Sequence, residues 1–183
     1  MDTKTIIKII SASRTKEYYI TQRKDFKIET ILDSADASVA FSIPDQVYPI
    51  TCESYVVVEH QEYIVKEISP VKNGYRDVKA ILNLEDLEGK LFSTYEKKAT
   101  AEAHLEEALK DTGWKLRCQL DDNTELTIED ENTTAKAIID QVREIFGIEV
   151  RYDTQSKVLY AARQIGDDKG VVFLKGVNLL KTE

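Results

Sequence analysis

Cysteine, histidine and glycine are scarce in this chain, and each shortage excludes a class of site. Its 183 residues include two cysteines, two histidines and seven glycines. The cysteines, Cys52 and Cys118, allow one bridge at most and show no CxxC spacing, which excludes a disulfide framework or zinc site. The motifs of metalloproteases, serine hydrolases, cysteine proteases and nucleotide-binding loops are all absent. We therefore predict no catalytic, cofactor-binding or metal-binding residues.

The charge balance and the lack of long apolar runs argue against nucleic-acid binding and against membrane insertion. Asp and Glu number 33 against 25 Lys and Arg, a net charge of −8. A surplus of negative charge disfavours specific binding to nucleic acid, whose phosphates attract basic proteins. Residues 1–10 carry four isoleucines broken by lysine, too short and too charged for a signal peptide. No stretch has the 18 or so apolar residues of a membrane-spanning helix, so we predict no membrane segment.

The first half of the sequence predicts β-structure. Five runs rich in β-branched and aromatic residues predict strands: 6–10, 18–21, 26–32, 55–59 and 63–69. Val39, Phe41 and Ile43 alternate with small residues, the period of a half-buried strand that Pro44 ends. Asn73-Gly74 predicts a type I′ hairpin, with a return strand over 78–82, and residues 60–61 a tight connection. Residues 84–87 predict one short helical turn.

The second half changes to a helical period. A helix is predicted after an N-cap at Thr100, with its apolar stripe at Ala101, Leu105, Ala108 and Leu109 and a stop at Gly113. A second helix spans about residues 134–146 and stops at Gly147. Its expected apolar stripe is Ala135, Ile138, Ile139, Val142, Ile145 and Phe146.

A strand follows each of these glycines. The strands at 114–118 and 148–153 make two helix–glycine–strand units 34 residues apart, and a turn at 154–157 leads to a last strand at 158–162. We expect both helices to pack on one face of a small sheet. The fold class is therefore α+β, an antiparallel β-barrel or sandwich followed by a small α-β domain.

An acidic stretch lies between the two helices. It contains no basic residue and comprises Asp121, Asp122, Glu125, Glu129, Asp130 and Glu131. It lacks the Asp-x-Asp-x-Asp-Gly spacing and the closing glutamate of a calcium loop. We therefore interpret it as a solvated loop. Asp130 and Glu131 favour the helix N-terminus that follows, where negative charge is stabilising.

The single residues that could take part in catalysis or ligand binding are each explained by a structural role. His60 lies at a hairpin tip and His104 on the first helix, while Cys118 and Trp114 lie where core residues are expected. One alternative stays open, a small peptidoglycan hydrolase whose site is assembled from scattered residues. Its candidate side chains are His60, Asp86 and Glu88.

The predicted organisation has three parts: a β-rich domain over residues 1–95, an α-β domain over 96–165, and the start of a further element over 166–183. The last part combines a polar turn, the apolar run 171–174, a glycine turn and Asn178-Leu179-Leu180. We expect this element to return to the β domain, and the whole chain to be a module of a larger protein.

The order of these segments resembles the N-terminal region of the prophage endopeptidase tail family, also called tail-associated proteins. The pieces that carry the resemblance are residues 39–44, 63–68, 84–87, 112–114, 146–150 and 166–179. The resemblance covers nearly the whole chain.

The resemblance implies a structural part of a phage or prophage tail tip, the trimeric baseplate hub that closes the tail tube. It implies self-association as a trimer in the assembled tail, contacts with the distal tail protein and other tail-tip proteins, and a place in the virion after synthesis in the bacterial cytoplasm. Relatives often carry a peptidoglycan-degrading domain further along, which these residues lack, so no enzymatic activity and no cofactor is expected. A hub-like component of a contractile injection or secretion system is the alternative within this class.

Overall fold

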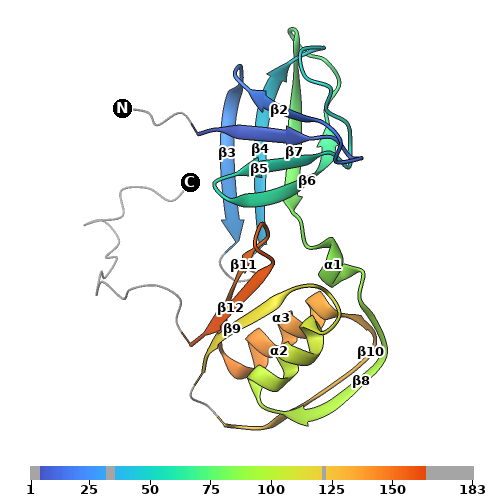
Figure 1. Cartoon of the computed structure of the whole chain (residues 1–183), viewed down its shortest axis with the longest axis vertical. Coiled ribbons are helices and arrows are strands. Elements are labelled where there is room, and N and C mark those ends of the chain that lie inside the picture. The colour runs from blue at the N-terminus through green and yellow to red at the C-terminus, as the bar shows by residue number, and fades with distance from the viewer. Residues whose placement is uncertain (1–4, 32–35, 121–122, 164–183) are drawn as a thin grey trace, which may run out of the picture.

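The first half of the chain folds as one curled antiparallel sheet of seven strands. The structure, a computed structural model, describes residues 5–31, 36–120 and 123–163. The strands of this sheet are β1 (Ile7–Ile10), β2 (Glu17–Ile20), β3 (Lys24–Ile31), β4 (Asp36–Pro44), β5 (Tyr55–Val58), β6 (Gln61–Ile68) and β7 (Tyr75–Leu82). Their order across the sheet is β2-β1-β5-β6-β7-β4-β3. In Figure 1, β1, β5 and β6 cross over β3, β4 and β7, so the sheet forms a half-barrel.

The core of the half-barrel follows the period-2 pattern of the sequence. Val39, Phe41 and Ile43 on β4 are buried, as their alternation predicts, and Pro44 is the last residue of the strand. They pack with Ile7, Ile9 and other inward-facing residues of the neighbouring strands in one cluster. The predicted α+β class is confirmed. Of the predicted barrel or sandwich, the sheet forms a half-barrel.

Local turn chemistry sets the register of the hairpins. Asn73 and Gly74 have φ angles of 52° and 76°, the positive values that a type I′ turn requires, so this predicted turn is confirmed. The turn between β5 and β6 uses Glu59 and His60, with φ angles of 48° and 64°. It therefore begins one residue earlier than predicted, because Gln61 already pairs with Val58 in the ladder.

The second half holds two helices between two small sheets. Its elements are α1 (Glu85–Glu88), β8 (Leu91–Ala99), α2 (Ala101–Leu109), β9 (Lys115–Gln119), β10 (Leu126–Thr134), α3 (Ala135–Phe146), β11 (Glu149–Asp153) and β12 (Val158–Ala162). Strands β8 and β10 form an antiparallel ribbon, and the other sheet has the order β11-β12-β9. Strand β12 is antiparallel to β11 and parallel to β9. Figure 1 shows α2 and α3 enclosed by these strands.

Both predicted helices begin at a capping threonine. The Thr100 hydroxyl accepts a hydrogen bond from the Ala103 amide, and Thr134 accepts one from Ala137. The predicted apolar stripe of α2 is buried throughout. The stripe of α3 is also buried except at its end, where Ile145 is 47% exposed. The prediction for Ile145 was wrong because Phe146, four residues after Val142, packs against the core from the last turn instead.

The two helices end differently. Gly147 has φ 60° and ψ 42°, and Ile148 donates its amide hydrogen to the Arg143 carbonyl, which makes the predicted glycine stop of α3 a Schellman motif. Helix α2 ends at Leu109, and Asp111 is the first residue after it with a left-handed φ, of 60°. Gly113 has φ 80° but lies in the following turn, so its predicted role as the helix stop was wrong.

The acidic stretch is a strand where a loop was predicted. Residues 126–134 form β10 and pair with β8, so that Glu129 stands opposite Glu96. Ile128 and Thr133 face inward and are buried, which supplies the contact that composition alone does not suggest. Asp130 holds α3 from the side, because its carboxylate accepts a 2.6 Å hydrogen bond from Gln141. Asp121 and Asp122 lie outside the described residues.

The domain boundaries stay a prediction, to which the strand pairing adds one fact. Strand β8 crosses the boundary at residue 95 and pairs with β10 of the second half. The expected element at residues 166–183 lies outside the described residues. Within the described part of the chain, no helix is long and apolar enough to span a membrane.

Candidate functional site

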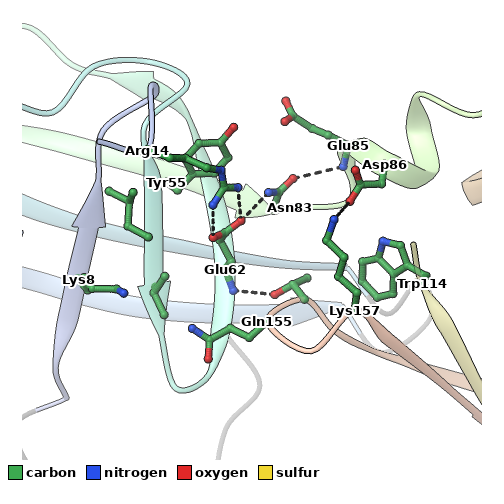
Figure 2. Close-up of a pocket in the computed structure, with 13 residues that line it drawn as sticks. Lys8, Arg14, Tyr55, Glu62, Asn83, Glu85, Asp86, Trp114, Gln155 and Lys157 are labelled. Atoms are coloured by element: carbon green, nitrogen blue, oxygen red, sulfur yellow. Dashed lines mark hydrogen bonds and ion pairs between the residues drawn. The ribbon is translucent and has the colours of Figure 1, made fainter. Parts of the chain in front are cut away.

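A cavity of about 710 Å³ lies where the half-barrel meets the second half of the chain. Its lining comes from β1 and the turn after it, from β5 and β6, from α1, and from the turn between β11 and β12. Figure 2 shows that charged and amide side chains make up most of its labelled wall, with Tyr55 and Trp114 as the aromatic members. We call this space the junction pocket.

A carboxylate held by two donors forms one side of the junction pocket. Arg14, in the left-handed region at φ 55°, reaches from the turn after β1 to Glu62 and binds its two oxygens at 3.0 and 2.8 Å. Asn83 donates a third hydrogen bond to the same carboxylate at 2.8 Å. The guanidinium also lies over the Tyr55 ring, 3.7 Å from its centroid, which fixes its orientation.

The electrostatic consequence is a stable ion pair. Burial raises the pKa of Glu62, but the hydrogen bonds from Arg14 and Asn83 and the nearby positive charges outweigh it and hold the pKa below its ordinary value. The hydrogen bond to Glu62 in turn raises the pKa of Arg14. Both groups are therefore charged at neutral pH.

The turn between β11 and β12 is tied to the half-barrel by a compact set of polar contacts. The Glu62 amide donates to the Thr154 hydroxyl at 2.6 Å, and that hydroxyl donates to the Gln61 side-chain oxygen at 2.9 Å. Gln61 also donates its amide hydrogen to the Tyr152 carbonyl at 2.9 Å. Residues about 92 positions apart thus join the two halves through hydrogen bonds.

The opposite side of the pocket has an ion pair next to the single tryptophan. Lys157 contacts the Asp86 carboxylate at 2.7 Å, with both side chains about half exposed. Trp114 is buried, as predicted for a core anchor, and its ring meets Tyr152 edge-on at 5.9 Å. Its indole nitrogen has no hydrogen-bond partner among the described residues. In Figure 2 this nitrogen lies on the ring edge turned toward Lys157 and Asp86.

His104 is enclosed by its partners. It is fully buried, its Nε2 lies 3.0 Å from the Leu126 carbonyl, and its Nδ1 lies 2.7 Å from the Tyr95 hydroxyl. A carbonyl only accepts, so Nε2 carries the hydrogen and Nδ1 accepts from the tyrosine. Burial raises the pKa of Tyr95 to about 12. The pair organises the core and has no accessible atom for acid–base chemistry.

No hydrogen bond or ion pair among the described residues joins the three residues of the hydrolase alternative. His60 lies exposed in the β5–β6 turn, and Asp86 is engaged with Lys157. Glu88 lines a different cavity, beside Lys136. The described contacts therefore give no common site for these side chains.

The cysteines have no activating environment. Cys52 is exposed, and its Sγ lies 3.8 Å from the Lys66 carbonyl. Burial raises the pKa of Cys118, which disfavours the nucleophilic thiolate. In the described ranges, no group of three or more His, Cys, Asp or Glu side chains is placed to hold a metal ion.

No motif in the sequence predicts the junction pocket. Its central residues, Arg14, Glu62, Asn83 and Lys157, lie far apart along the chain and belong to no motif. The only local signal is Trp114, the single tryptophan, directly after a helix and its turn.

Comparison with known proteins supports the resemblance found in the sequence. Residues 93–165 match the family model of the prophage endopeptidase tail domain. The fold is similar to that of prophage tail protein gp18 from Listeria monocytogenes EGD-e, with a TM-score of 0.72 and 20% identity over 85% of this chain and 50% of that one. No curated protein sequence matches the chain.

Two further solved tail proteins share the fold. The 43 kDa tail protein of prophage MuSo2 from Shewanella oneidensis has a TM-score of 0.61 and 14% identity over 92% of this chain and 58% of that one. The tail protein from Neisseria meningitidis MC58 has a TM-score of 0.60 and 13% identity over 92% and 52%. The chain spans about half the length of these tail proteins.

Proposed function

We propose that this chain is a structural part of a phage or prophage tail, at the tip, where it contributes to the baseplate hub that closes the tail tube. The observation that carries the proposal is the agreement between two results: the tail-domain match over residues 93–165, and the fold shared with three tail proteins over 85–92% of the chain. The half-barrel and the helix-containing second half are both included in that shared fold.

In the assembled tail the chain associates with copies of itself as a trimer and docks on the distal tail protein and other tail-tip proteins. The half-barrel supports such contacts, because β2 and β3 are the outer strands of its sheet and pair on one side only within the described residues. Backbone groups of such strands are available to a neighbouring subunit. We place the protein in the virion on the same grounds.

The distribution of charge fits a protein that tolerates passing DNA without binding it. Residues 85–163 contain 18 acidic and 11 basic residues, a net charge of −7, which is nearly all of the −8 of the chain. The half-barrel is close to neutral. Negative charge on the second half repels phosphate and keeps DNA from adhering.

The chain acts by binding, without catalysis of its own. Three features support this: the enclosed His104, the raised pKa of Cys118 and the engagement of Asp86 with Lys157. The tail proteins that share its fold are named as tail proteins, and none of those names states an activity.

A genetic experiment tests the proposal. The coding sequence is deleted from an inducible prophage, and the lysate is examined by negative-stain electron microscopy with and without a complementing copy. We expect tails to be absent or to lack their tip, and complementation to restore them. An antibody to the protein should label one end of intact tails. Normal, infectious tails in the deletion strain would refute the proposal.

A further inference from the structure

The carboxylates that line the junction pocket are all engaged, Glu85 with Lys66 at 3.7 Å, whereas one of its hydrogen-bond donors has no acceptor in the described part of the chain. Glu62 accepts from Arg14 and Asn83, and Asp86 accepts from Lys157. The indole hydrogen of Trp114 has no acceptor among the described residues, although the side chain is only 6% exposed and its nitrogen is buried. A buried donor without an acceptor is unfavourable and rare in native proteins, so this one requires an explanation.

The ammonium groups add further donors. Lys8 contacts Glu17 at 3.2 Å and Lys157 contacts Asp86 at 2.7 Å, and each ammonium carries three hydrogens. Lys157 and Asp86 are about half exposed, so this pair is open to exchange with solvent or with another carboxylate. The Lys115 amide donates to the Lys157 carbonyl at 2.9 Å, which holds the backbone of Lys157 beside the residue that follows Trp114.

We propose that the junction pocket is a docking site for an acidic side chain on a segment of a partner tail protein. The incoming carboxylate replaces Asp86 as the partner of Lys157 and accepts the indole hydrogen of Trp114. This inference rests on the proposed function, which supplies the class of partner, while the chemistry of the ligand comes from the donors that the pocket leaves open.

Asp86 on α1 is the internal competitor in this exchange. In the free protein Asp86 occupies Lys157 and covers the charge, so the pocket is internally neutral until a competing carboxylate arrives. A charged acceptor gains more from a buried donor than a neutral one does. The pocket therefore selects Glu or Asp over Gln or Asn in the docking segment.

The test uses a matched pair of blocked peptides, acetyl-Gly-Gly-Glu-Gly-Gly-amide and the same peptide with Gln in place of Glu, added to the full chain at low ionic strength. Trp114 is the only tryptophan, so the ¹H–¹⁵N spectrum contains one indole signal, which reports on the site directly. We expect the Glu peptide to shift this signal saturably in the millimolar range. The Gln peptide should leave it nearly unchanged.

Variants of the pocket should change the affinity for the Glu peptide in opposite directions. By calorimetry, Trp114→Phe and Lys157→Gln should each weaken binding of the Glu peptide about tenfold, the effect of losing one hydrogen bond to a charged group. Asp86→Asn should strengthen it several-fold, because the competing carboxylate is gone. Glu88→Gln on the same helix and Lys115→Gln on β9 are matched controls that should bind as the wild type does.

Stability measurements guard against trivial failures. Trp114→Phe removes a donor without a partner but also leaves a gap where the buried indole packed, so its melting curve is recorded to show that the variant is folded at the temperature of the binding measurement. An equal response to the Glu and Gln peptides, or wild-type binding by both Trp114→Phe and Lys157→Gln, would overturn the proposal. Free glutarate is a second arm, and binding as tight as that of the peptide would indicate a small-molecule site instead. Failure here with tip-less tails in the deletion strain would leave the tail function standing.

Discussion

Replacing Gly147 should separate backbone strain from side-chain crowding at the end of α3. Gly147 has φ 60° and ψ 42°, and a Cβ built there meets nothing within 4 Å. The cost of Gly147→Val is therefore conformational, on the order of 1–2 kcal/mol, because a β-branched residue is disfavoured in the left-handed region. For a chain of this size that corresponds to a melting temperature lower by about 2–8 °C.

The assay is thermal unfolding followed by circular dichroism at neutral pH. Gly147→Asn is the matched control, since it adds a Cβ at the same place but asparagine tolerates this conformation. We expect it to lose less than half of what Gly147→Val loses. Gly113→Val should behave like Gly147→Val, because Gly113 has φ 80° and equally open space around its Cβ.

The outcome that would refute this reasoning is specific. If Gly147→Val and Gly147→Asn melt together, the loss arises from the added atoms and not from the backbone conformation. If Gly147→Val melts with the wild type, α3 does not end in the Schellman motif described above.

The remaining predictions use other parts of the molecule. Tyr95→Phe should cost about 1–3 kcal/mol in urea unfolding because it leaves a buried imidazole acceptor unpaired. In the wild type the folded-state pKa of Tyr95, about 12, exceeds the ordinary value of 10, so the wild type should lose more stability than the variant between pH 10 and 12. Arg14→Gln should cost about 1–2 kcal/mol at pH 7, a difference that disappears as the pH falls through the lowered pKa of Glu62; an equal loss at pH 3 would contradict the ion-pair explanation. Iodoacetamide should modify Cys52 quickly and Cys118 slowly, as peptide mass spectrometry would show; equal rates would contradict the burial of the second thiol. Light scattering of this chain alone should show weak trimerisation or none, and a tight twofold dimer would contradict the hub proposal.

The parts of the fold that the sequence predicts are those set by local chemistry. The turn at Asn73-Gly74 needs two positive φ angles, and the residues themselves favour them. The caps at Thr100 and Thr134 are equally local, since each hydroxyl meets an amide three residues on. Alternation on β4 is visible because one face of that strand is buried and the other is not.

The parts that escape prediction depend on distant partners. Strand β10 is acidic, and its composition predicts a loop. It nevertheless pairs with β8, about 30 residues earlier, and only Ile128 and Thr133 of the strand are buried. The end of α2 was misplaced because Asp111, which is tolerated in the left-handed region, takes the position expected of Gly113.

The junction pocket could not be predicted for the same reason. Arg14 and Glu62 meet across 48 positions, and Lys157 and Asp86 meet across 71. Pairing over such distances leaves no spacing to recognise in a single sequence. Only the fold, which brings the β11–β12 turn against β6, creates the site.

The place of β12 in its sheet has a consequence for how the protein is made. It is the last described strand to leave the ribosome, yet it lies between β9 and β11 and is the only strand within the described ranges that pairs with either of them. Until it emerges, neither neighbour has a hydrogen-bonding partner in that sheet among the described residues, although α2 and α3 can already pack against each other and against β8 and β10. The three-stranded sheet therefore forms in one late step, and we expect a nascent chain stopped before residue 158 to be recognised by chaperones and proteases, although all seven strands of its half-barrel have emerged.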